Sequence, residues 1–198
     1  MRVLSNDLKI LKKNYGEIFK FSYAGIEAAI DDLSNSERKS YLLNRLNKVK
    51  NEAIDYVKKQ RDVSHCSGCG VCCRFAVSEF SPEELVEKSK CGDNFATQFI
   101  STFVPYHSED EYSNIFPEYI ELLKDEKYYV YHCPKVTDDN KCPDYENRPQ
   151  ICRDFPDNPI AFLPPNCGFM DWKLKSEPVW LKLRAEVEII NYYLEKLN

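Results

Sequence analysis

The sequence predicts a mainly α-helical protein, in which a helical hairpin and a C-terminal helix pack on an irregular, cysteine-rich core with little β structure. Apolar residues recur at steps of three and four near both ends of the 198-residue chain. The middle of the chain is instead rich in cysteine and proline and shows little periodicity. We therefore expect a helical hairpin over residues 1–62, a cysteine-cluster domain over 63–177 and a closing helix over 178–198.

The N-terminal hairpin is predicted from two apolar stripes. The first helix runs from about Asp7 to Leu33, with Gly16 and Gly25 as weak points. Ser34 and Glu37 then form a capping box that starts a second helix, which ends near residue 60. We expect these stripes to pack on each other and on the cysteine-rich core; packing on a partner subunit is the alternative. Their members are Leu8, Leu11, Tyr15, Ile18, Ile26, Ala29 and Leu33 in the first helix, and Leu42, Leu46, Val49, Ala53 and Val57 in the second.

A strong sequence signal for the start of a helix follows the first cysteines. Ser81 is suited to the N-cap, Pro82 to the first helical position and Glu84 to the third, and the helix should end near Gly92.

Shorter elements fill the rest of the middle. Helices are expected near 95–103 and 117–124, and extended pieces at 74–77 and 128–131, the second of which is rich in tyrosine. The closing helix should begin at Pro178, since proline is tolerated in a first helical turn, and it should pack beside the hairpin. Its apolar stripe consists of Trp180, Leu183, Val187, Ile190 and Leu194.

Charge and hydropathy exclude two classes of partner. Residues 1–65 carry a net charge of +4 and residues 66–198 one of −9, and an acidic body argues against binding of nucleic acid. No apolar run approaches the roughly 18 residues of a membrane span, and no signal peptide is evident. We expect a cytoplasmic protein, and in that reducing compartment structural disulfides are disfavoured.

Eight of the nine cysteines are predicted to be metal ligands. Thiolates are soft ligands that suit zinc or iron-sulfur iron, and the small Gly68 and Gly70 permit a tight turn between the first of them. Cys91 has no neighbour at ligand spacing and is expected to be a buried small hydrophobe. The predicted ligands are Cys66, Cys69, Cys72, Cys73, Cys133, Cys142, Cys152 and Cys167.

The spacing of the cysteines fits more than one metal. Three cysteines two residues apart, at 66, 69 and 72, match the start of a bacterial ferredoxin run, whose remaining ligand precedes a proline, as do Cys133 and Cys142. A 4Fe-4S cluster is one interpretation. Eight thiolates also divide evenly into two zinc sites, and one cluster with one zinc ion is a third arrangement. Arg74, Arg148 and Arg153 lie near the cysteines in sequence and would offset the negative charge of such a site. Ordinary surface ion pairing with Asp144, Glu146 or Asp154 is the alternative.

The order of these residues resembles a known family. The pattern Cys66-x2-Cys69-Gly-x-Cys72-Cys73, with two later Cys-Pro pairs, Tyr-Glu-x-Arg-Pro-x2-Cys-Arg-x-Phe-Pro over 145–156 and Cys167-Gly, is similar to the CxxCxxCC cysteine-cluster family. That family is described as a zinc- or iron-chelating domain, and the resemblance covers roughly residues 66–168. It implies the eight matching cysteines as ligands. A related branch, the flagellin lysine N-methylases, has longer chains and uses S-adenosylmethionine.

Three functions are therefore expected, in this order. The first is an iron-sulfur protein that transfers electrons or serves a partner enzyme. The second is a zinc module with two four-cysteine sites that supports a protein-binding surface. The third is a small methylase-like enzyme that uses S-adenosylmethionine. In the first two cases the partner would be a protein, with no nucleic acid or membrane involved.

Overall fold

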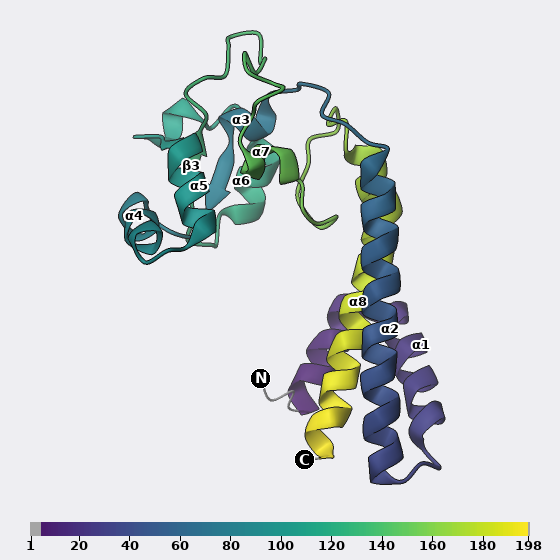
Figure 1. Ribbon diagram of the computed structural model, residues 1–198. Helices are drawn as coiled ribbons and strands as arrows, with labels where there is room; N and C mark the ends of the chain where they lie inside the picture. Colours follow the sequence, from purple (N-terminus) through teal and green to yellow (C-terminus); the bar gives the residue numbers. More distant parts are fainter. Residues whose placement is uncertain (1–4, 198) are drawn as a thin grey trace. The chain divides into compact units, whose positions relative to one another are not determined.

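The computed structural model describes residues 5–197, with side chains described from residue 16 onward except at residues 18 and 19. The chain is 58% helical with 5% in strands, which confirms the mainly α class. It divides into a helical unit, residues 1–64 with 171–198, and a cysteine-rich unit, residues 65–170 (Figure 1). Among the described helices, none combines the length and the apolar character that a membrane crossing needs.

The helical unit contains three long helices, α1 (Ser5–Ile30), α2 (Asn35–Asp62) and α8 (Met170–Lys196). Between α1 and α2, the Ser34 backbone N–H donates to Oε2 of Glu37 at 3.0 Å, which is the Glu37 half of the expected capping box. α1 is interrupted at Gly16, whose φ of +50° is open to glycine but costly for other residues. The expected stripe positions Leu8, Leu11, Tyr15 and Ile18 lie outside the described side chains.

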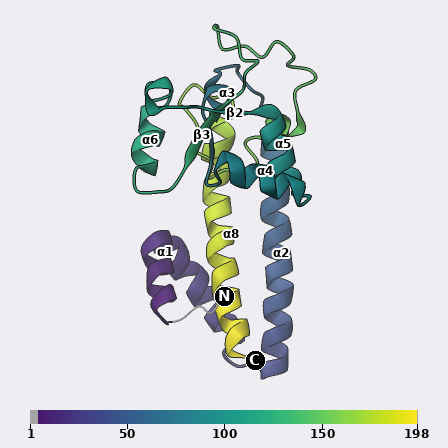
Figure 2. The ribbon, with the colours of Figure 1, turned by 90° about the vertical axis from the view of Figure 1, so that its left-hand side faces the viewer.

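The three helices share one apolar cluster. Ile26 and Ile30 of α1, Leu42 of α2 and the pair Ile189 and Ile190 of α8 are buried together. α8 runs beside α2 in both views of the ribbon (Figures 1 and 2). The expected packing of the closing helix on the hairpin is thereby confirmed. Packing of these helices on the cysteine-rich core stays a prediction.

The closing helix begins earlier than expected. α8 starts at Met170, so Pro178 lies inside the helix and not in its first turn. Trp172 accounts for the difference, because its side chain is 1% exposed and its indole Nε1–H donates to the Val57 carbonyl oxygen at 2.9 Å. This contact to α2 stabilises helical structure ahead of the proline. Pro178 still lacks the backbone N–H that a helix interior uses.

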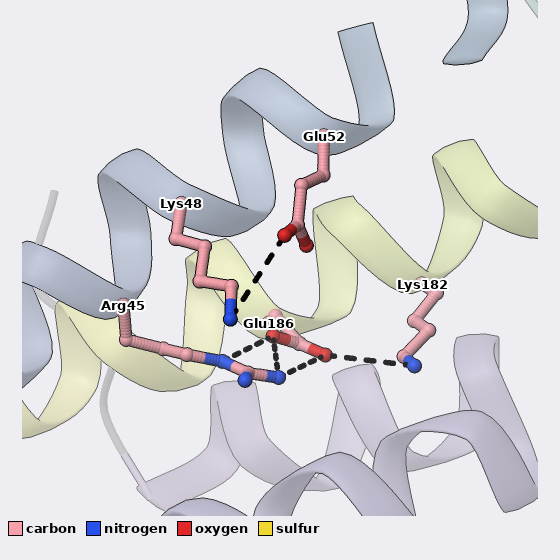
Figure 3. A network of polar contacts seen from close by, with 5 residues as sticks. All are labelled: Arg45, Lys48, Glu52, Lys182 and Glu186. Carbon is pink, nitrogen blue, oxygen red and sulfur yellow. Dashed lines mark hydrogen bonds and ion pairs between the residues drawn. The ribbon is translucent and has the colours of Figure 1, made fainter. Parts of the chain in front are cut away.

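A buried carboxylate lies between α2 and α8 (Figure 3). Glu186 is 2% exposed. Arg45 donates two hydrogen bonds to its Oε2 atom, from Nε at 3.1 Å and from Nη2 at 2.9 Å. Lys182 approaches the same carboxylate at 4.0 Å, while the neighbouring Lys48–Glu52 pair is exposed. Two charge-assisted hydrogen bonds offset the desolvation of Glu186. Because a displaced Arg45 would leave the carboxylate unpaired, the contact selects one register of α2 against α8.

The cysteine-rich unit is built from short elements. In chain order these are α3 (Val71–Arg74), β1 (Ala76–Ser78), α4 (Pro82–Lys90), α5 (Asn94–Thr102), β2 (Val104–Pro105), the 3-10 turn η1 (Glu109–Glu111), α6 (Pro117–Leu123), β3 (Tyr129–His132) and α7 (Gln150–Asp154). The predicted helices α4, α5 and α6 and the strand β3 are confirmed. At the start of α4, Ser81 Oγ accepts from the Glu84 N–H at 3.2 Å, as predicted.

A small antiparallel sheet in the order β1-β3-β2 organises the core of this unit. Successive side chains of a strand face opposite sides. Tyr131 of β3 accordingly packs with Leu85 and Phe99 in one cluster, while Val130 packs with Phe75 in another. The central strand β3 thus separates two apolar clusters and ends at the residue before Cys133.

The structure corrects the expected extended piece at residues 74–77. Arg74 is the last residue of helix α3, and strand β1 begins only at Ala76. The helix begins because Gly70 adopts a left-handed N-cap conformation, with φ +74°, and the Phe75 N–H then closes the turn on the Val71 carbonyl oxygen at 2.7 Å.

The apolar cluster of the helical unit predicts the effect of a core truncation. Leu42 is fully buried, so Leu42→Ala should lower the free energy of unfolding by about 2–5 kcal/mol. Urea denaturation followed by tryptophan fluorescence measures this, since both tryptophans lie in α8. The adjacent Leu43 is 43% exposed and provides the control. Leu43→Ala should change the free energy by within about 0.5 kcal/mol. Equal effects of the two substitutions would contradict the packing described.

Candidate metal centre

The first cysteines lie on a tight turn that leads into α3. Gly68 and Gly70 have φ angles of +70° and +74°, a region that glycine enters without steric cost. The Gly68 N–H donates to the Cys66 sulfur at 3.3 Å. Cys66 and Cys69 therefore lie in the loop, and Cys72 and Cys73 follow within the helix. The expectation that two small residues permit this turn is confirmed.

Cys72 and Cys73 form a hydrogen-bonded pair of thiols with opposite tendencies. The hydrogen bond from Cys72, together with the nearby guanidinium groups of Arg148 and Arg74, lowers the pKa of Cys73 to about 7. The same hydrogen bond, followed by burial, raises the pKa of Cys72 well above its usual value. Cys73 is thus the member that becomes a thiolate first, and Cys72 keeps its proton.

Cys133 is attached directly to this helix. Its backbone N–H donates to the Cys73 carbonyl oxygen at 2.6 Å, where β3 ends. His132, the residue before it, stacks on Tyr106 with ring centroids 4.5 Å apart. This stack places the His132 ring against an aromatic neighbour.

The loop that precedes Cys142 is also held by α3. Arg74 Nε donates to Oδ1 of Asn140 at 2.7 Å, and its Nη2 donates to the Thr137 carbonyl oxygen at 2.8 Å. Asn140 has a φ of +65° and lies against Gly70, where a Cβ atom would come within 2.5 Å of the asparagine Cβ. Arg74 therefore positions residues 137–140, and through them Cys142, beside the helix that carries Cys73.

Cys152 lies on the short helix α7. The neighbouring Ile151 N–H donates to Oε1 of Gln98, at 3.1 Å, which anchors α7 to α5. Burial raises the pKa of the Cys152 thiol to about 11, and the nearby thiols of Cys73, Cys133 and Cys142 act in the same direction. Arg148 opposes this shift. Four cysteines are thus close enough to influence one another.

Cys167 is brought to the other end of the cysteine cluster by Ser67. The Ser67 hydroxyl donates to the Asn166 carbonyl oxygen at 3.0 Å and accepts from the Gly168 N–H at 3.1 Å. A Cβ atom at Gly168 would lie 2.1 Å from the His65 carbonyl oxygen, so only glycine allows this approach. Burial raises the pKa of Cys167, and the thiols of Cys69 and Cys66 act in the same direction.

All nine cysteines are free thiols, and the eight expected ligands are partly buried. Among the described residues, no three His, Cys, Asp or Glu side chains stand in metal-ligating geometry. The donor set nevertheless fits zinc or iron, because soft thiols are gathered near cationic arginines and one sulfur already accepts a backbone N–H.

Cys91 is exposed, and the expectation of a buried hydrophobe was wrong. It is the C-cap of α4, and Gly92 follows it with a φ of +88°. The apolar face of α4 buries Leu85 instead, which is fully inaccessible. Cys91 thus lies at a helix end on the surface and is not part of the core.

Comparison with known protein families matches the cysteine-rich part of the chain. Residues 65–173, more than half of the chain, match the family model CxxCxxCC, described as "Putative zinc- or iron-chelating domain". Comparison with curated proteins and with solved structures gives no match.

The close approach at Gly168 generates a prediction. Gly168→Ala should displace residues 166–168 from the turn at 66–69, at a cost of about 1–3 kcal/mol or more, because backbone atoms of His65 and Ser67 leave no space for a methyl group. Hydrogen exchange of peptides covering residues 65–74 measures the loss as faster exchange.

The control is Gly25→Ala, where a Cβ atom meets nothing within 4 Å. It should leave exchange at residues 65–74 unchanged. If residues 65–74 of Gly168→Ala exchanged at the wild-type rate, the contact of Gly168 with His65 and Ser67 would not be what holds the turn.

Proposed function

The chain belongs to the CxxCxxCC family of zinc- or iron-chelating domains, and from this membership we propose that it is an iron-sulfur protein carrying a 4Fe-4S cluster. The observation that supports iron-sulfur chemistry is the run Cys66-x2-Cys69-x2-Cys72 on one glycine-containing turn. This spacing is that of cubane-binding ferredoxins, in which three thiolates come from one short segment. The N–H donated to the Cys66 sulfur is also typical of cluster ligands.

Two arginines are suited to tuning such a centre. Arg74 and Arg148 favour the charged form of the Cys73 thiol, so positive charge lies beside the sulfurs. A cluster held by four thiolates is negative, and cationic neighbours raise its reduction potential. When bound, the cluster would supply one-electron transfer. The residues of this chain would hold it, partly exclude water from it and set its potential.

The proposed role is redox or accessory, in the service of a partner enzyme in the cytoplasm. The net charge of −9 over residues 66–198 favours a protein partner with a basic docking surface and disfavours nucleic acid.

A zinc-binding interaction module with two four-cysteine sites is the second candidate. The observation in its favour is that the Cys152 thiol lies near three others, those of Cys73, Cys133 and Cys142. Zinc sites with four thiolates are tetrahedral and structural. Methyl transfer, the third expectation, has no observation in its favour among the described residues.

Metal analysis of protein isolated without oxygen tests the proposal. We expect brown protein that contains iron and acid-labile sulfide. Colourless protein that contains zinc but no sulfide would overturn the iron-sulfur proposal and support the zinc module.

Substitution of single cysteines tests the ligand set. Cys69→Ser and Cys152→Ser should each lower both metal content and the yield of folded protein, because metal binding contributes directly to folding free energy. Cys91→Ser is the matched control and should keep the wild-type metal content, since Cys91 is an exposed helix cap. Loss of metal in Cys91→Ser with retention in Cys152→Ser would contradict the proposed ligands.

A further inference from the structure

We infer that the eight cysteines form two separate four-thiolate sites, which share no ligand and meet at one peptide bond. The first site consists of Cys66, Cys69, Cys72 and Cys167, and the second of Cys73, Cys133, Cys142 and Cys152. This inference rests on the proposed metal binding and adds the division of ligands, which neither the spacing nor the family description provides.

The first site is closed by the Ser67 clamp. Its hydroxyl bonds to both Asn166 and Gly168, the two residues that flank Cys167. Ser67 itself lies between Cys66 and Cys69, so the clamp places the distant cysteine opposite the turn.

The second site gathers around the C-terminal end of α3. Cys133 is joined to Cys73 by the backbone hydrogen bond of 2.6 Å. Arg74, the next residue, holds the loop that leads to Cys142. Cys152 completes the set from α7, which is anchored independently to α5. Cys133 and the loop before Cys142 are thus bonded to this helix end, and Cys152 lies near the thiols of Cys73, Cys133 and Cys142.

The electrostatic neighbourhoods agree with this division. The thiols that act on Cys152 are those of Cys73, Cys133 and Cys142, all assigned to the second site. Cys167 is influenced by the thiols of Cys69 and Cys66, both assigned to the first.

The two sites meet at Cys72 and Cys73. Successive residues on a helix project about 100° apart, so adjacent cysteines suit different centres. Cys73 has the largest influence on Cys72, followed by Cys66 and Cys69 of the first site. Cys73 lies near Arg148 and Arg74, and Arg148 also acts on Cys152 of the second site. Their mutual hydrogen bond marks the boundary between the sites.

A ferredoxin-like arrangement makes a different assignment. There the fourth ligand to the 66–72 run would precede a proline, as Cys133 and Cys142 do. Cys167 instead precedes glycine. Gly168 fits against the His65 backbone only because it has no Cβ atom. The close packing therefore explains why glycine follows Cys167.

Pulsed alkylation of the wild-type protein tests the division. Protein isolated without oxygen is treated with increasing chelator, labelled with N-ethylmaleimide at each step and analysed by peptide mass spectrometry. Metal and sulfide are quantified in the same samples. We expect Cys66, Cys69, Cys72 and Cys167 to become reactive together, and the other four together in a separate phase. The exposed Cys91 should react before any chelator is added, which makes it an internal control.

Paired substitutions provide a second, independent readout. Cys167→Ser should leave the metal of one centre bound, and Cys69→Ser/Cys167→Ser should lose no more than Cys167→Ser alone. Cys152→Ser/Cys167→Ser should lose both centres.

Release of Cys133 or Cys142 with the 66–72 run, or of all eight cysteines in one phase, would overturn the division. Zinc without sulfide in the wild-type protein would overturn the iron-sulfur proposal. The groups of cysteines that become reactive together would still test the division into two sites. Wild-type protein that binds neither metal would overturn the metal-binding function itself.

Discussion

Two close approaches to one short segment hold the cysteine-rich unit together. The Cys133 N–H meets the Cys73 carbonyl oxygen at 2.6 Å, and Gly168 lies against the His65 carbonyl oxygen with no space for a side-chain carbon. Two segments that are distant in sequence thus contact residues 65–74. The proline-rich chain beyond Cys133 has few regular backbone pairings of its own, so its order depends on these contacts and on whatever joins the sulfurs.

Gathering thiols in one place creates an electrostatic problem that a cation solves. Burial and neighbouring thiols raise the pKa of Cys152 to about 11, whereas Cys73 reaches about 7 with help from its hydrogen bond and two arginines. A metal ion binds thiolates, so loading must release the protons that the other thiols hold near neutral pH. The arginines contribute part of the compensating charge. They are too few for several thiolates, which is consistent with a need for metal.

Local signals in the sequence predicted most of the helices. Features that depend on long-range contacts could not be predicted from it. The caps at Ser34 and Ser81 depend on residues three positions away, so they were visible in the sequence. The start of α8 was not, because it depends on the Trp172 contact with Val57. For the same reason, the grouping of the cysteines could not be read from spacing. It depends on a left-handed Asn140 and on the reach of Arg74, neither of which has a local signature.

The meeting of His65 and Gly168 also bears on how the helical unit folds. The cysteine-rich unit is inserted between α2 and α8, so packing these helices closes a loop of roughly one hundred residues. Loop-closure entropy grows as the logarithm of length and is on the order of 4 kcal/mol for a disordered insertion of this size. An ordered insertion whose own ends already touch shortens the effective loop to a few residues. Order around the cysteines therefore lowers the entropic cost of assembling helices that contain none of the eight.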